Sequence, residues 1–139
     1  MRNTKKALAI ALLMICIFSF VTVYCHADNS PEIMPRWNNI GDVSTAFTFY
    51  DDIGEAVATA SRGNMITSMV GTVTIYKYQN NDWIYVDSIS KTTTRTTLFV
   101  SLEIEGTSGA EYKMEFLLTA YNGTTVMEEI TDVKYATCP

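Results

Sequence analysis

The chain has 139 residues, of which 47% are hydrophobic and 12% aromatic, and fifteen Asp/Glu against ten Lys/Arg give a formal net charge of −5. This length is typical of a single domain with its own core, and the aromatic content argues against intrinsic disorder. An acidic chain without a basic stripe repels phosphate backbones, so nucleic acid is excluded as an expected partner.

The first 27 residues have the pattern of a secretion signal. Basic residues open the segment, an apolar run of 17 residues follows at 7–23, and small residues close it at Cys25 and Ala27. A signal peptidase reads such an ending. We therefore expect cleavage after Ala27 and a secreted or cell-surface protein. The alternatives are an uncleaved signal, which would tether the domain to a membrane, and a lipid anchor at Cys25.

Cleavage would change the chemistry of the chain. It removes Arg2, Lys5 and Lys6, which leaves seven Lys/Arg against fifteen Asp/Glu and a net charge of −8. It also removes His26, the single histidine, and two of the three cysteines, so that Cys138 remains. Without histidine, Ser-His-Asp and Cys-His catalysis and histidine-based zinc sites are excluded in their usual forms. We expect no enzyme and no cofactor; a hydrolase built on two carboxylates is the alternative, but no pair stands out.

The rest of the chain has the periodicity of β-structure. Residues 28–35 contain two prolines and read as a flexible lead-in. From 36 to 136, short period-two runs alternate with turn residues, which predicts an all-β sandwich or barrel. Seven strands are expected, at about 40–50, 55–62, 65–78, 83–90, 93–105, 112–120 and 124–135.

The first three strands each have one side that is expected to face the core. These inward residues are Val43, Thr45, Phe47 and Phe49, then Ala56, Ala58 and Ala60, then Val73 and Ile75. The alanines indicate a closely packed position where a large side chain opposite fills the volume. Gly71 interrupts the third strand and is interpreted as a β-bulge.

Three carboxylates cluster around the first turn, at Asp51, Asp52 and Glu55. Calcium prefers several oxygen ligands from one loop, so these residues form a weak calcium-site hypothesis. The spacing does not match the known calcium-loop pattern. Solvated acidic side chains at a turn are the alternative.

Four aromatic residues gather around the expected hairpin at 79–82, namely Tyr76, Tyr78, Trp83 and Tyr85. If they face outward, they form a platform that could stack on sugar rings or pack against a protein partner. In the alternative, Trp83 lies in the core and the tyrosines are ordinary cross-strand pairs. The platform makes an extracellular protein or a glycan the expected partner.

The second half of the domain contains an unusual threonine-rich segment and the most regular strand. Lys91–Thr97 is interpreted as a recognition face or as an exposed edge strand guarded by its two cations. Asn122-Gly123 is a hairpin signal. In the strand before it, Tyr112, Met114, Phe116, Leu118 and Ala120 are expected on one face. In the strand after it, Val126, Glu128 and Ile130 are expected on one side, with Met127 and Glu129 on the other.

The stretch 109–123 resembles the sixth strand of fibronectin type III and immunoglobulin-like domains. Tyr112 follows a glycine-bearing turn, which is the place of a tyrosine corner, whose hydroxyl bonds to upstream backbone. The wider pattern, with Arg36-Trp37 at the start and Trp83 beyond the hairpin, is similar to a group of small secreted proteins of Gram-positive bacteria. The resemblance implies an antiparallel immunoglobulin/fibronectin type III-like β-sandwich of about seven strands, and no particular activity.

Residues 137–139 are predicted to form a C-terminal tail. Cys138 on this tail is either an inert thiol or the site of a disulfide to another chain, such as a linked homodimer. The sequence therefore predicts a secreted, non-enzymatic binding module. The alternatives are a secreted toxin, bacteriocin or inhibitor-like effector, and an envelope structural subunit linked through Cys138.

Overall fold

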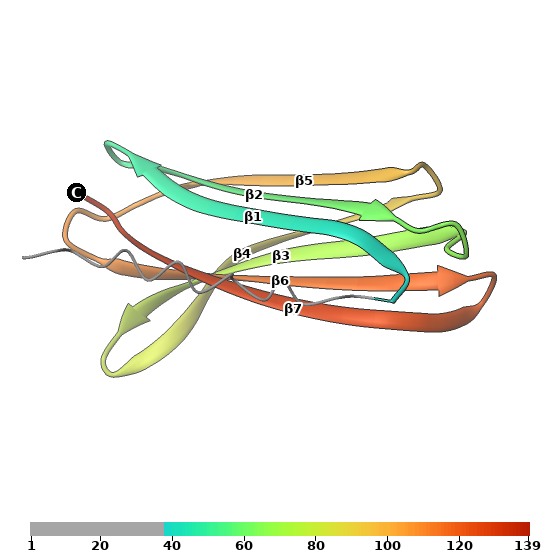
Figure 1. The fold of residues 1–139 in the computed structure, drawn as a ribbon. Coiled ribbons are helices and arrows are strands. Elements are labelled where there is room, and N and C mark those ends of the chain that lie inside the picture. Colours follow the sequence, from blue (N-terminus) through green and yellow to red (C-terminus); the bar gives the residue numbers. More distant parts are fainter. Residues whose placement is uncertain (1–37) are drawn as a thin grey trace, which may run out of the picture. The chain divides into compact units, whose positions relative to one another are not determined.

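The structure, a computed structural model, describes residues 38–139, so the signal segment, the lead-in and Arg36-Trp37 lie outside the described residues. All strand pairs are antiparallel and form two sheets, ordered β1-β2-β5 and β4-β3-β6-β7 (Figure 1). The strands are β1 (Ile40–Tyr50), β2 (Ile53–Arg62), β3 (Ser68–Gln79), β4 (Asp82–Thr93), β5 (Thr97–Glu105), β6 (Glu111–Asn122) and β7 (Thr125–Thr137). The predicted immunoglobulin/fibronectin type III-like sandwich is confirmed. None of the described segments is a helix long and apolar enough to cross a membrane.

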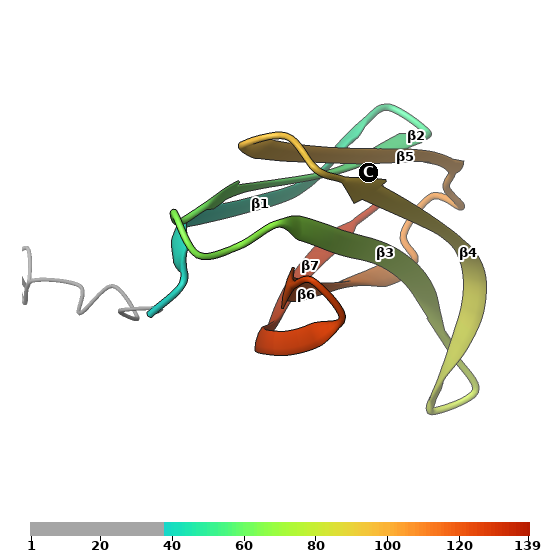
Figure 2. The same ribbon diagram turned by 90° about the vertical axis from the view of Figure 1, so that its right-hand side faces the viewer.

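The two sheets pack face to face, and the core fills the space between them (Figure 2). The predicted inward sides of β1, β2, β3 and β6 are confirmed. Ala56, Ala58 and Ala60 are at most 2% exposed, and Phe116 of the opposite sheet is fully buried. The three alanines therefore lie at closely packed positions of the core, as their pattern predicted.

Gly71 supports this packing in a different way from the predicted bulge. Its pairing with β4 and β6 is regular on both sides. A Cβ atom at Gly71 would lie 2.4 Å from Leu98 Cδ2 and 3.0 Å from Phe116 Cε2. Gly71 is therefore required because two core side chains pack directly against its backbone, and the bulge prediction was wrong.

Register shifts lie elsewhere, at Gly41 in β1, at Val86 in β4 and at Met127 in β7. Ile75 pairs with Asp87 but Tyr76 pairs with Tyr85, so Val86 is the extra residue of its strand. In β7, the extra residue Met127 reverses the alternation before it. Val126 is consequently 50% exposed while Ile130 is buried and Met127 packs against the core, so the prediction that Val126 and Ile130 share one side was wrong.

The threonine-rich segment Lys91–Thr97 spans the end of β4, a loop and the start of β5. Since β4 extends to Thr93 and β5 starts at Thr97, the predicted boundary between the two strands was a few residues too early. β4 is an edge strand of its sheet. The position of Lys91 on it agrees with the edge-strand interpretation.

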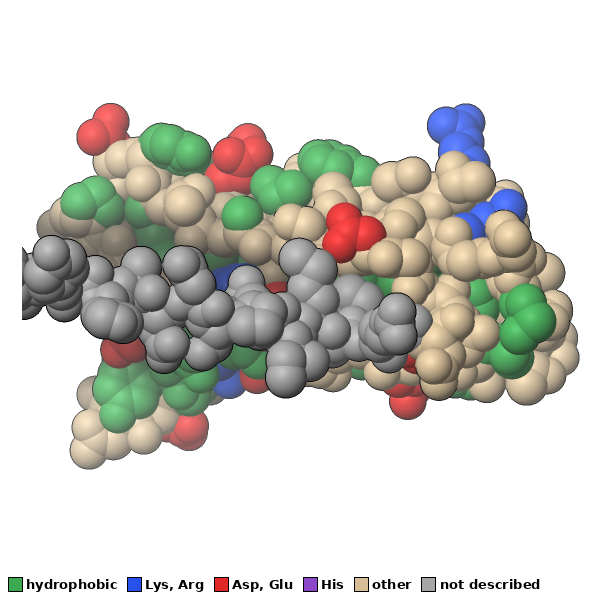
Figure 3. Space-filling model, viewed as in Figure 1, with side chains coloured by type: hydrophobic (Ala, Val, Ile, Leu, Met, Phe, Trp, Pro, Cys, Tyr) green, Lys and Arg blue, Asp and Glu red, His purple; other side chains and the backbone are tan. Residues whose placement is uncertain are grey.

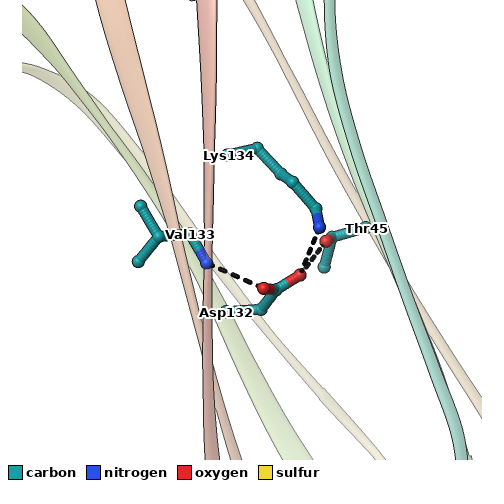
Figure 4. Close-up of polar contacts among 4 residues, drawn as sticks. All are labelled: Thr45, Asp132, Val133 and Lys134. Atoms are coloured by element: carbon teal, nitrogen blue, oxygen red, sulfur yellow. Dashed lines mark hydrogen bonds and ion pairs between the residues drawn. The ribbon is translucent and has the colours of Figure 1, made fainter. Parts of the chain in front are cut away.

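A polar contact joins the two sheets where β1 approaches β7 (Figure 4). The Asp132 carboxylate of β7 accepts hydrogen bonds from the Thr45 hydroxyl of β1 and from the backbone N–H of Val133, the latter at 3.0 Å. It also pairs with Lys134 at 3.3 Å. Burial alone raises the pKa of Asp132, but these hydrogen bonds and the charge of Lys134 outweigh it. The pKa of Asp132 therefore lies below its ordinary value of 3.8.

We expect Asp132→Asn to lower the free energy of unfolding by about 1 kcal/mol at neutral pH, because water partly screens this edge site. The folded pKa is below the unfolded one, so the carboxylate stabilises the fold above about pH 4 and loses this effect as the pH falls through the folded pKa. Urea unfolding from about pH 7 to pH 2.5 measures the difference between wild type and variant. The difference should shrink below about pH 4; an equal difference at both ends of the range would contradict the assignment.

Candidate functional site

The four predicted aromatic residues come together on the outer face of the four-stranded sheet. Tyr76 lies directly opposite Tyr85, and Tyr78 lies opposite Trp83. The ring centroids are 6.4 Å apart in the first pair and 5.1 Å apart in the second. A fifth ring, that of Tyr135 from β7, lies 5.7 Å from Trp83. We call these five residues the aromatic cluster.

The aromatic cluster depends on the shape of the β3–β4 hairpin. Asn80 and Asn81 both have positive φ angles, 55° and 64°, as a two-residue type I′ turn requires. Trp83 and Tyr135 belong to opposite edge strands of the sheet, which in a flat sheet would lie about 14 Å apart. Because their rings are only 5.7 Å apart, the hairpin must curl over the outer face. Figures 1 and 2 show this hairpin bending away from the rest of the sheet.

Three tyrosines of the aromatic cluster are open to solvent. Tyr78 is 42%, Tyr85 58% and Tyr135 60% exposed, while Tyr76 and Trp83 are half-buried. Hydrophobic side chains gather on the projecting hairpin, at the lower left of Figure 3. The interpretation that Trp83 lies in the core was therefore wrong, because its side chain packs on the outer face.

Lys113 of β6 lies beneath the aromatic cluster. Its Nζ atom is 4.6 Å from the ring centroid of Tyr76 and 5.1 Å from that of Trp83. It also forms an ion pair of 2.7 Å with Glu115, and its side chain is only 15% exposed. The cation–π contacts orient the rings of Tyr76 and Trp83, and the ion pair with Glu115 compensates the charge of Lys113.

Two pairs of hydroxyl groups continue the same face beyond the aromatic cluster. Thr74 bonds to Ser88 at 3.2 Å, and Thr72 bonds to Ser90 at 2.9 Å. In register, these pairs directly follow the Tyr76–Tyr85 pair along β3 and β4. We call these four residues the hydroxyl ladder. The outer face thus changes from aromatic to hydroxyl-bearing along one pair of strands.

Lys113 and Tyr135 were missed as members of the site. Period-two alternation places Lys113 on the outer side of its strand, but nothing in the sequence alone sets the strand order of the sheet. That order brings Lys113 between Tyr76 on one side and Tyr135 on the other. The strand order of a fibronectin type III domain, applied to the predicted strands, would have placed Lys113 and Tyr135 beside Tyr76.

The three carboxylates near the first turn are not placed to hold a metal ion together. Asp51 and Asp52 make the two-residue turn between β1 and β2. Within residues 38–139 there is no group of three or more His, Cys, Asp or Glu side chains placed to hold a metal ion. Asp52 instead uses its backbone carbonyl, which accepts a hydrogen bond from Gly106 at 2.6 Å. The calcium-site hypothesis for Asp51, Asp52 and Glu55 is therefore not supported.

Tyr112 has the contacts of a tyrosine corner. Its side chain is 2% exposed, and its hydroxyl oxygen accepts a hydrogen bond of 2.9 Å from the backbone N–H of Thr107. Its ring also packs against Phe49, with centroids 5.1 Å apart. Tyr112 therefore ties the turn before β6 to the core.

Cys138 lies in the core, in place of the predicted tail. It is 1% exposed, and its Sγ atom lies 3.7 Å from the backbone oxygen of Asp51. Its backbone N–H donates to Ala110 at 3.0 Å, and its carbonyl accepts from Gly109 at 2.9 Å. A disulfide to another chain would require this segment to leave the core and break both hydrogen bonds.

Comparison with known proteins finds similar folds but no sequence family. No protein-family model and no curated protein sequence matches the chain. Similar solved structures include OgpA from Akkermansia muciniphila, with a TM-score of 0.43 and 11% identity over 73% of this chain and 30% of that one. The sporulation control protein Spo0M from Bacillus subtilis has a TM-score of 0.38 and 10% identity over 73% of this chain and 50% of that one. FN3tt has a TM-score of 0.32 and 12% identity over 73% of this chain and 95% of that one.

The chain therefore spans less than a third of the length of the OgpA chain that it matches. All three identities are 12% or lower, so the similarity concerns the fold alone. Sandwiches of this class carry many unrelated functions, and the function must be argued from the surface of this chain.

Proposed function

We propose that this protein is a secreted, non-enzymatic binding module and that the aromatic cluster is its ligand-binding surface. The observation that carries the proposal is the exposure of Tyr78, Tyr85 and Tyr135, between 42% and 60%, beside a Trp83 held in place from below. Exposed, contiguous aromatic side chains in a fixed orientation lose little entropy on binding, and they are typical of binding hot spots.

The signal pattern of residues 1–27 supports a partner outside the cell, either a glycan or another protein. The burial of Cys138 disfavours the alternative of an envelope subunit linked through that thiol. A secreted toxin, bacteriocin or inhibitor-like effector would also be exported. A growth-inhibition assay on neighbouring bacteria would identify such a function. Mass spectrometry of the exported protein should find Asp28 at the N-terminus if the signal is cleaved.

A binding assay tests the proposed surface. The fluorescently labelled protein is added to intact cells and extracellular material of its source, and bound protein is measured over a concentration series. Tyr85→Ala/Tyr135→Ala should reduce binding at least tenfold, because it removes the two most exposed rings of the aromatic cluster. Tyr50→Ala, at a tyrosine 66% exposed at the end of β1 in the other sheet, is the matched control and should bind normally.

Equal binding by the double variant and the Tyr50→Ala control would overturn the proposed surface. Circular dichroism of both variants confirms folding. Tyr85→Ala and Tyr135→Ala each remove one aromatic pair, which is expected to cost about 0.5–1.5 kcal/mol. Tyr50→Ala should change stability by no more than about 0.5 kcal/mol.

A further inference from the structure

The charges at the aromatic cluster favour an uncharged ligand. A cation would seek the faces of Tyr76 and Trp83, but the protein's own Lys113 already occupies the space between them. An anion would seek Lys113, but Glu115 neutralises it at 2.7 Å and its side chain is 15% exposed. The faces of Tyr76 and Trp83 that Lys113 contacts are therefore closed to a cation, and the charge of Lys113 is already compensated by Glu115.

The size of the exposed surface favours a small ligand over a second copy of the chain. The exposed fractions of Tyr78, Tyr85 and Tyr135 together equal about one and a half tyrosine side chains, roughly 300 Å². Two or three sugar rings could cover an area of this size. A second copy of the chain would bury about 800 Å² on each partner in a stable interface, so it would have to extend well beyond the aromatic cluster.

The hydroxyl ladder adds hydrogen-bonding groups to the surface and makes it longer. Each Thr–Ser pair uses one hydroxyl proton internally, which leaves one donor and several acceptor lone pairs for a ligand. A proline-rich peptide offers mainly carbonyl acceptors, whereas sugar hydroxyls both donate and accept. Four rungs, from Tyr78–Trp83 to Thr72–Ser90, follow one another at about 7 Å and give a track of roughly 20 Å.

We infer that the aromatic cluster and the hydroxyl ladder together bind a neutral oligosaccharide of several sugar units. The rings stack on the C–H faces of two or three sugars, and the ladder bonds to the hydroxyl groups of the next ones. This inference rests on the proposed binding function and adds the class of ligand.

The test measures binding of the purified protein to defined probes by tryptophan fluorescence and calorimetry. The probes are neutral linear hexaoses of glucose, mannose and N-acetylglucosamine, hexaoses that carry carboxylates or sulfates, and a proline-rich decapeptide. At least one neutral hexaose should bind, and the charged ones should bind at least tenfold more weakly. Tyr85→Ala/Tyr135→Ala should weaken this binding at least tenfold, and Tyr50→Ala should leave it unchanged.

A second pair of variants tests the ladder itself. Thr74→Val/Ser88→Ala keeps the shape of one rung but removes its hydroxyls, and it should weaken binding of the neutral hexaose at least threefold. Thr48→Val, on the exposed side of β1 in the other sheet, is the control and should not change the affinity. Full affinity of the ladder variant, or no binding of any neutral hexaose at millimolar concentration, would overturn the inference.

The outcomes separate the ligand class from the proposed function. Binding of the decapeptide alone, lost in the tyrosine double variant, would overturn the glycan assignment and leave the binding surface intact. Cell binding that does not depend on Tyr85 and Tyr135 would overturn the surface itself.

Discussion

Phe116→Ala is expected to lower the free energy of unfolding by about 3–5 kcal/mol, the largest effect of any single substitution proposed for this chain. Phe116 is fully buried at the middle of β6, where it packs against the backbone of Gly71. Leu98 and Val100 of the opposite sheet approach the same backbone position of Gly71, and both are at most 2% exposed. Removal of the ring from this closely packed core should leave a cavity, and the cost of that cavity adds to the lost apolar burial.

Urea unfolding followed by circular dichroism measures this effect. The matched control is Leu117→Ala, one position along the strand on the outer face, where the side chain is 45% exposed. The control should change the free energy of unfolding by about 0.5 kcal/mol or less. A cost below about 1 kcal/mol for Phe116→Ala would show that the neighbours relax into the cavity and that the packing around Phe116 is not tight.

The alternation of side chains made most of the fold predictable. In β6, five successive alternate residues from Tyr112 to Ala120 are buried, and only a strand with one face on a core produces this pattern. The bulges at Val86 and Met127 could not be predicted in the same way, because a single inserted residue leaves the composition of the strand unchanged. Whether the alternation shifts depends on the partner strand, which the local sequence does not specify.

The candidate site was predictable where its residues are close in sequence. Tyr76, Tyr78, Trp83 and Tyr85 flank one turn, so a hairpin necessarily brings them together. Tyr135 joins them only because the hairpin curls across the sheet, which is a property of sheet twist and packing rather than of local sequence.

Cys138 shows a similar limit of local reasoning. Its place next to the last residue predicted a loose end, since chain termini are usually poorly held. In the structure, the backbone of Cys138 pairs with the turn before β6, and its thiol fills space beside Gly106, where a Cβ atom would lie 2.7 Å from Sγ. The Cys138 side chain, packed beside Gly106, therefore helps to hold a C-terminus that composition alone predicts to be loose.

Tyr112→Phe, next to the turn before β6, is expected to lower the free energy of unfolding by about 1–3 kcal/mol. The substitution keeps the buried ring against Phe49 but removes the oxygen that accepts the 2.9 Å hydrogen bond from the Thr107 N–H. Thr107 also accepts a hydrogen bond of 3.0 Å from Lys77 Nζ through its side-chain oxygen. Loss of the hydroxyl should therefore loosen a turn that is connected to both β3 and the core.

Thermal and urea unfolding of Tyr112→Phe, with Tyr50→Phe as the control, measure this contribution. The control loses an equivalent hydroxyl from a side chain that is 66% exposed, so it should change stability by only a few tenths of a kcal/mol. Because Tyr112 lies at the start of β6, next to the turn that it holds, amide hydrogen exchange there should also speed up in the variant. If the two variants were equally stable, the Tyr112 hydroxyl would have no role in holding the turn, and ring packing alone would explain its burial.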